Sequence, residues 1–121
     1  MRRFAVLLLP FLALAPAAHA TDVTGLWELS TRINQTPVVI HCSVLQIGVD
    51  LSGWCRPESN GIDPSAITGQ LDGANARWGY DVVFRGQKNH VDYSATLTSP
   101  TAMTGVLTGT GAPAAFTAVR K

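Results

Sequence analysis

Hydrophobic and polar residues alternate along the chain from residue 25 onward, in short runs that end at Gly, Pro, Asn or Asp. Strict alternation is typical of a β-strand with one buried face, and runs that recur about every ten residues are typical of all-β domains. Helix signals are nearly absent from this part of the chain. We therefore predict eight strands, at residues 25–33, 38–47, 50–55, 66–71, 76–84, 90–98, 103–108 and 115–120.

The two faces of the predicted strands differ in polarity. In residues 76–84, Trp78, Tyr80 and Val82 alternate with Arg77 and Asp81. One apolar face and one polar face indicate an antiparallel sheet that covers a core. Short turns allow consecutive strands to pair. We predict an eight-stranded antiparallel up-and-down β-barrel, with an open β-sandwich as the alternative. Charged outer faces and short strands argue against an outer-membrane barrel, which needs an apolar outer band.

Residues 1–20 have the pattern of a secretory signal peptide. Arg2 and Arg3 precede an apolar run over residues 4–15, and Ala18-His19-Ala20 is a small-x-small cleavage pattern. The run is too short for a membrane-spanning helix. We expect cleavage before Thr21, a single barrel domain over residues 21–121, and export to a bacterial periplasm or to the outside of the cell.

Charge limits the classes of partner. The nine Lys and Arg include Arg2 and Arg3, so the chain after the leader keeps seven against eight Asp and Glu, a net charge of −1. This composition lacks the basic surface that nucleic acid or an anionic membrane requires. We expect neither partner.

The two cysteines have the spacing of a cross-strand disulfide. If Gly48-Val49 is a type II′ hairpin turn, the register pairs residues whose numbers sum to 97, as those of Cys42 and Cys55 do. The alternation makes this a non-hydrogen-bonded pair, close enough for a disulfide in an oxidising compartment. A two-cysteine metal site is the alternative, but His41 would point to the opposite face and no other ligands lie nearby. We predict no metal and no cofactor.

The two ends of the predicted domain resemble those of the calycin superfamily, which joins lipocalins, fatty-acid-binding proteins and avidins. "VTGLW" opens the first strand and "FTAVRK" closes the last. The resemblance implies that Gly25 and Trp27 belong to a Gly-x-Trp motif that closes one end of the barrel, and that Arg120 packs across the indole. An indole that plugs a barrel under a stacked guanidinium is also physically reasonable, since the pair contributes about 0.5–2 kcal/mol.

Two calycin-like functions can be tested on the residues. Avidins share Thr-Gly-x-Trp, but where they place an Asn for the biotin ureido oxygen this chain has Leu29, which removes that hydrogen bond. Secreted inhibitors of bacterial metalloproteases are also similar, as small Gly-x-Trp barrels with one disulfide that block the enzyme with an N-terminal arm. Here the arm would be only Thr21 to Thr24.

Catalytic patterns are weak in this sequence. His90, Asp92 and Ser94 share one strand face and can be grouped with His41, but alternate residues on a strand are about 7 Å apart and that face is the wetter one. We interpret them as a solvated strand face. The glycines of "TGQLDG" and "TGVLTGTG" fit turns and tight packing better than an anion-binding loop.

Aromatic residues supply the candidate binding surfaces. Trp78, Tyr80, Phe84 and Tyr93 either line a ligand cavity or fill the core, and both interpretations stay open. Trp54 would face away from the disulfide and is a candidate contact for a partner. We expect a non-enzymatic binding protein for a small apolar or amphipathic ligand. The alternative is a protein-interaction module of the cell envelope, or a secreted protease inhibitor that acts through loops.

Overall fold

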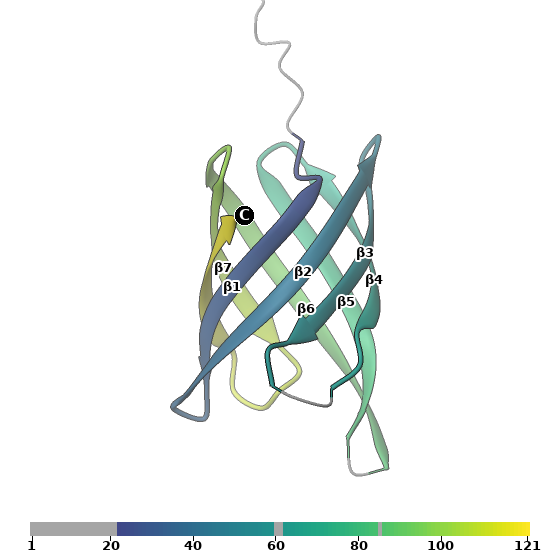
Figure 1. Cartoon of the computed structure of the whole chain (residues 1–121), viewed down its shortest axis with the longest axis vertical. Coiled ribbons are helices and arrows are strands. Elements are labelled where there is room, and N and C mark those ends of the chain that lie inside the picture. Colours follow the sequence, from purple (N-terminus) through teal and green to yellow (C-terminus); the bar gives the residue numbers. More distant parts are fainter. Residues whose placement is uncertain (1–21, 60–61, 85) are drawn as a thin grey trace, which may run out of the picture.

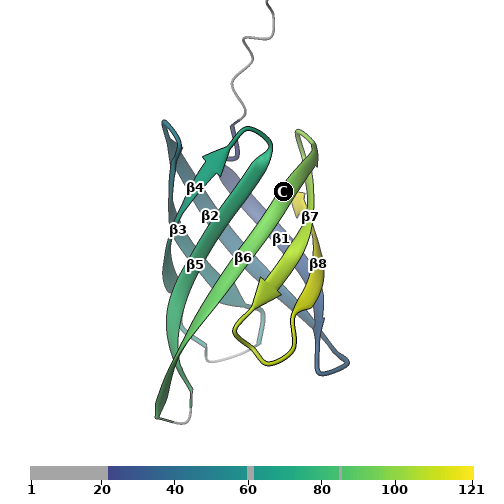
Figure 2. The ribbon, with the colours of Figure 1, turned by 180° about the vertical axis from the view of Figure 1, so that it is seen from behind.

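The computed structural model describes residues 22–59, 62–84 and 86–121, which form a closed barrel of eight antiparallel strands (Figures 1 and 2). Each strand pairs with the next, and β8 pairs with β1 from Trp27–Arg120 to Thr31–Phe116. The strands are β1 (Gly25–Ile33), β2 (Thr36–Ile47), β3 (Asp50–Pro57), β4 (Ser65–Asp72), β5 (Asn75–Phe84), β6 (Gln87–Ser99), β7 (Ala102–Thr108) and β8 (Ala114–Arg120). The predicted up-and-down barrel is confirmed, and the open β-sandwich is wrong because β1–β8 pairing closes the sheet.

The strand boundaries follow from turn geometry. Gly48 has φ +64° while Val49 has no positive φ, as a type II′ turn requires, and Ile47 pairs with Asp50. β2 starts at Thr36, two residues before the predicted strand, because Asn34 and Gln35 both take positive φ and make a two-residue turn. The predicted leader, residues 1–20, lies outside the described residues. Within the described part of the chain, no helix has the length and hydropathy needed to cross a membrane.

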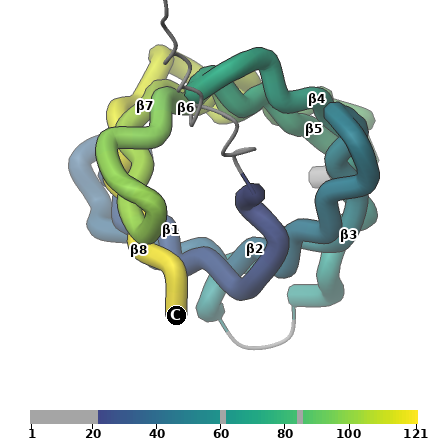
Figure 3. Tube along the Cα trace, turned by 90° about the horizontal axis from the view of Figure 1, so that it is seen from above, coloured from purple at the N-terminus to yellow at the C-terminus, as the bar shows by residue number. Residues whose placement is uncertain are grey.

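The barrel has two unlike ends. The plugged end carries the start of β1, the end of β8 and the β2–β3, β4–β5 and β6–β7 turns; the loop end carries the other four connections. Viewed from above, the first described residues lie over the ring of strands at the plugged end (Figure 3). Val23 in this segment is buried.

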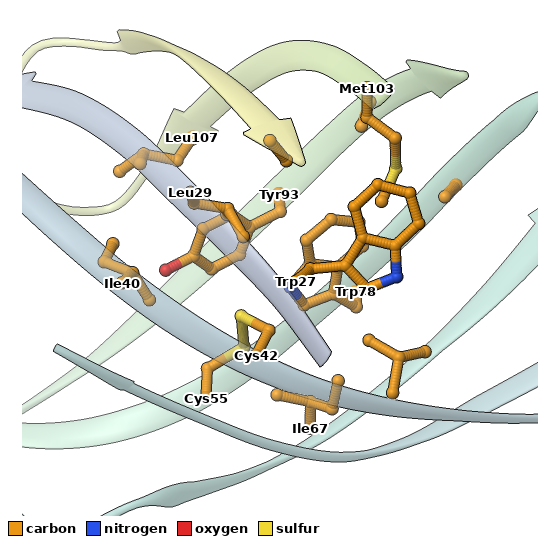
Figure 4. Packing of buried hydrophobic residues seen from close by; sticks show 14 of the residues in the cluster. Trp27, Leu29, Ile40, Cys42, Cys55, Ile67, Trp78, Tyr93, Met103 and Leu107 are labelled. Atoms are coloured by element: carbon orange, nitrogen blue, oxygen red, sulfur yellow. A yellow bond between two sulfur atoms is a disulfide. The ribbon is translucent and has the colours of Figure 1, made fainter. Parts of the chain in front are cut away.

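Side chains of alternate residues fill the interior. Trp27, Leu29, Tyr93 and Leu107 are among the buried residues, and the Cys42–Cys55 disulfide lies between them and the wall formed by β2 and β3 (Figure 4). Two glycines at inward positions let neighbouring strands approach closely. A Cβ on Gly53 or on Gly69 would lie 1.9 Å from a backbone oxygen of the adjacent strand. Gly69 belongs to the "TGQLDG" segment, where the sequence pattern indicates turns and tight packing, whereas Gly53 is outside the segments singled out there.

Candidate functional site

The disulfide joins β2 to β3 inside the barrel. Cys42 pairs with Cys55 in the predicted register, their Cα atoms are 4.0 Å apart, and both residues are buried. The predicted bridge is confirmed, and the two-cysteine metal site is wrong because each sulfur is bonded to the other. No cluster of three or more His, Cys, Asp or Glu suited to a metal occurs among the described residues. A disulfide is typical of a protein outside the reducing cytoplasm.

Trp27 and Arg120 meet at the plugged end. The Trp27 ring is fully buried and its Nε1–H donates to the Val23 carbonyl at 2.9 Å. The Arg120 guanidinium carbon lies 5.0 Å from the centre of that ring. Arg120 also donates to the carbonyls of Thr24, at 2.6 Å, and of Asp22. The structure thus brings the three residues of the calycin-like motif together, since a Cβ on Gly25 would lie 3.6 Å from the guanidinium.

Residues 22–24 are bound to the barrel rather than free. The Val23 N–H donates to Gln46 Oε1 at 2.9 Å, and the Gln46 N–H donates to Thr24 Oγ1 at 3.0 Å. Val23 is absent from the predicted site residues. Its sequence signal is an apolar residue two positions before the Gly-x-Trp motif. This segment serves as part of the plug, so Asp22, Val23 and Thr24 do not form a projecting arm.

An aromatic cluster occupies the middle of the barrel. The rings of Trp78 and Tyr93 stack, with centres 5.1 Å apart and planes 7° apart, and Tyr80 packs on Tyr93 at 5.8 Å. Phe116 meets both stacked rings edge-on. It was not among the predicted cavity residues, although the alternation of β8 places it inside. The Phe84 side chain lies outside the described residues. The candidate cavity residues Trp78, Tyr80 and Tyr93 therefore pack against one another.

The cluster contains a pair of phenols. The hydroxyl oxygens of Tyr80 and Tyr93 are 2.7 Å apart, and these residues are only 8% and 1% exposed. Burial raises the pKa of both phenols, and for Tyr93 the nearby Tyr80 raises the pKa further. Both groups therefore stay protonated at neutral pH. The indole Nε1 of Trp78 is also buried, and it has no hydrogen-bond partner.

Two apolar side chains lie on the inner face of the barrel towards its loop end. Val82 follows Tyr80 on the inner face of β5, and Val38 lies on the inner face of β2 near its start. Both are partly buried and pack against the core. At the plugged end, Trp27 and Val23 are buried and hydrogen-bonded to each other.

Two of the four candidate catalytic residues, His90 and Asp92, come within hydrogen-bond distance, so the expectation that strand spacing keeps them about 7 Å apart is wrong for this pair. His90 Nδ1 is 2.7 Å from Asp81 Oδ1, and His90 Nε2 is 3.0 Å from Asp92 Oδ1. The hydrogen bond to Asp81, with the charge of Asp92, raises the pKa of His90. The carboxylates favour the protonated imidazole, in which both ring nitrogens donate and neither has a lone pair to act as a base.

The two other grouped residues lie apart from this ion pair. Ser94 is on the same outer face of β6 but makes no side-chain bond to His90 or Asp92. His41 lies on β2, where its Nε2 is 3.0 Å from Glu58 Oε2. Asp81, which the sequence grouping omits, faces His90 directly across β5 and β6. The outer face of the barrel therefore carries a histidine in contact with two carboxylates, and the Ser94 hydroxyl makes no hydrogen bond to it.

Trp54 lies on the outer surface, as predicted. It is 36% exposed, and Leu26 and Leu45 nearby are exposed as well. Ser43 pairs with Leu26 on one side and with Trp54 on the other, so a small side chain separates two large apolar ones. This surface is the candidate contact for a protein partner.

Comparison with protein-family models, with curated proteins and with solved structures finds no match for this chain. The likeness to calycins therefore rests on the closed eight-stranded barrel and on the contact between Trp27 and Arg120. Neither feature carries a function with it.

Proposed function

We propose that the protein is an exported, non-enzymatic binding protein that holds a small apolar or amphipathic ligand at the loop end of the barrel. The unlike ends of the barrel carry this proposal. Trp27, Val23 and Arg120 close one end, whereas towards the other end the core continues into the partly buried Val38 and Val82. An apolar surface with a few converging polar groups is the usual form of a small-molecule site.

Export is part of the proposal. The leader pattern of residues 1–20 and the buried disulfide both favour an oxidising compartment, which we take to be a bacterial periplasm or the cell exterior. A catalytic role is not favoured, because both nitrogens of His90 are occupied by carboxylates.

A first experiment asks whether the protein carries its ligand. Native mass spectrometry of the mature protein, purified from its own compartment, should show a retained small molecule that dissociates on activation. A second experiment measures binding of the neutral fluorescent probe N-phenyl-1-naphthylamine. Val82→Arg should abolish probe binding because it places a charge among the apolar side chains at the loop end. Val83→Arg is the matched control, since Val83 is 72% exposed. A folded wild-type protein that retains no molecule and binds no probe would overturn the proposal.

A second candidate function is a protein-interaction module. The exposed surface of Leu26, Leu45 and Trp54 favours it, since aromatic and aliphatic anchors with a polar surround are typical of interfaces. Trp54→Ser should remove a specific partner from pull-downs of the exported fraction while probe binding at the loop end stays unchanged. Identical partners for both proteins would refute this role for Trp54.

A further inference from the structure

The aromatic cluster has more hydrogen-bond donors than it has acceptors for them. Tyr80 and Tyr93 each have one hydroxyl proton, and their single mutual hydrogen bond uses one of the two. The second proton has no acceptor among residues 22–59, 62–84 and 86–121. Whichever tyrosine donates, one buried O–H is left without a partner.

The neighbouring ring adds a second unpaired donor. Trp78 is 3% exposed, its Nε1–H has no partner, and its ring stacks on Tyr93 (Figure 4). An indole nitrogen can only donate. Buried polar groups without partners are rare in folded proteins, because each loses its bonds to water without replacement. Two such donors on adjacent rings indicate that an acceptor belongs there.

The charge of the interior limits which acceptor fits. Thr31 is the one buried polar residue in the described interior outside the cluster, and its hydroxyl donates to the Ala115 carbonyl at 2.7 Å. Among the described residues no Lys, Arg or His is buried, and Arg120 is held by backbone carbonyls at the plugged end. A carboxylate in the cluster would be desolvated without a counter-charge, which is costly.

Building on the proposed ligand site, we propose that the cluster recognises a neutral oxygen acceptor, such as the carbonyl of a ketone, ester or amide, on an otherwise apolar molecule. A carbonyl oxygen has two lone pairs and can accept from both a phenol and the Trp78 Nε1–H. The raised pKa values keep the phenols in their donating form. Tyr80 is the more exposed phenol and lies towards the loop end. Its side chain is therefore the one that moves aside when the ligand binds.

The test uses three probes of equal chain length: 2-octanone, octanoate and 1-octene. We expect 2-octanone to bind about tenfold more tightly than either of the others, the value of one well-made buried hydrogen bond. The readout is the indole Nε1–H resonance in ¹⁵N NMR spectra. The Trp78 signal should move downfield with 2-octanone. Trp27, which already donates to Val23, and Trp54, on the outer surface, are internal controls.

Proton counting makes a sharper prediction for variants. Tyr80→Phe and Tyr93→Phe each leave one hydroxyl whose proton is free to donate, so each single variant should keep the preference for the ketone. The double variant has no hydroxyl proton and keeps only the Trp78 Nε1–H, so its preference for 2-octanone over 1-octene should be smaller than that of either single variant. Circular dichroism melting checks that each variant is folded.

Failure of this inference can be told apart from failure of the proposed function. Equal binding of the three probes, with an unmoved Trp78 signal, would overturn the carbonyl inference and leave a ligand site. Binding of none would overturn both. A Trp78 N–H that transfers magnetisation to a long-lived bound water, and still does so with 2-octanone bound, would also overturn it, because water would then be the acceptor.

Discussion

The contact between Arg120 and the start of the chain should contribute measurably to stability. We expect Arg120→Met to lower the free energy of unfolding by about 2 kcal/mol, because methionine keeps much of the apolar stem but loses every donor of the guanidinium. The partly buried bond to Thr24 is worth about 1 kcal/mol, and the exposed bonds to Asp22 and Pro100 together add about 0.5 kcal/mol. Stacking on Trp27 at 5.0 Å adds about 0.5–1 kcal/mol.

Urea unfolding under non-reducing conditions, followed by tryptophan fluorescence, measures this change. In thermal unfolding, the same loss of about 2 kcal/mol should lower the melting temperature by about 8–16 °C for a domain of this size. Arg56→Met is the matched control, since Arg56 is exposed on β3, and it should change stability by less than about 0.5 kcal/mol.

Hydrogen exchange gives a second reading of the same contact. The Trp27 Nε1–H should exchange faster in Arg120→Met, because its acceptor Val23 lies between the two carbonyls that Arg120 holds. Equal urea midpoints for Arg120→Met and Arg56→Met, with unchanged Trp27 exchange, would refute the role assigned to Arg120.

Three further predictions concern the wall of the barrel. Replacing Cys42 and Cys55 by Ala should cost about 3 kcal/mol of stability in urea unfolding, since the bridge spans 13 residues, and thiol titration of the unfolded, unreduced wild type should find no free thiol. Gly53→Ala should lower the melting temperature far more than a surface substitution, because the new Cβ would lie 1.9 Å from a β2 oxygen. In NMR titration His90 should lose its proton at a pH above 6.5, and Asp81→Asn should lower that midpoint. The stabilising effect of the pair is then present below pH 6.5 and is lost as the pH rises through the folded pKa; a midpoint unaffected by Asp81→Asn would contradict the assigned cause.

Local turn chemistry explains why so much of the fold could be predicted. Gly48 has the positive φ that a two-residue turn needs at its first position, and this places Cys42 opposite Cys55 without any knowledge of distant contacts. The same arithmetic applied to the β5–β6 hairpin puts Asp81 opposite His90. Asp81 was therefore open to prediction, but the sequence grouping combined His41 with alternate residues of one strand and did not use the register between β5 and β6.

Contacts set by tertiary packing could not be predicted in this way. Val23 becomes part of the plug only because the barrel closes beneath it and Gln46 accepts its N–H. Whether aromatic rings line a cavity or stack depends on side-chain rotamers and on the barrel radius, which alternation does not report. The unpaired Nε1–H of Trp78 is a property of that packing and has no sequence signal.

Pairing between β1 and β8 also governs when the chain can complete its fold during synthesis. These strands lie at opposite ends of the domain, and contacts of such long sequence separation form slowly. The chain is synthesised from its amino end. The backbone groups of β1 that pair with β8 therefore stay without these partners until the last residues have emerged. A chain truncated before β8, a strand of seven residues, would keep most of its core residues but leave β1 and β7 as open edges. Because exposed edges recruit other strands, loss of a short carboxyl-terminal segment would convert a self-contained barrel into an aggregation-prone sheet.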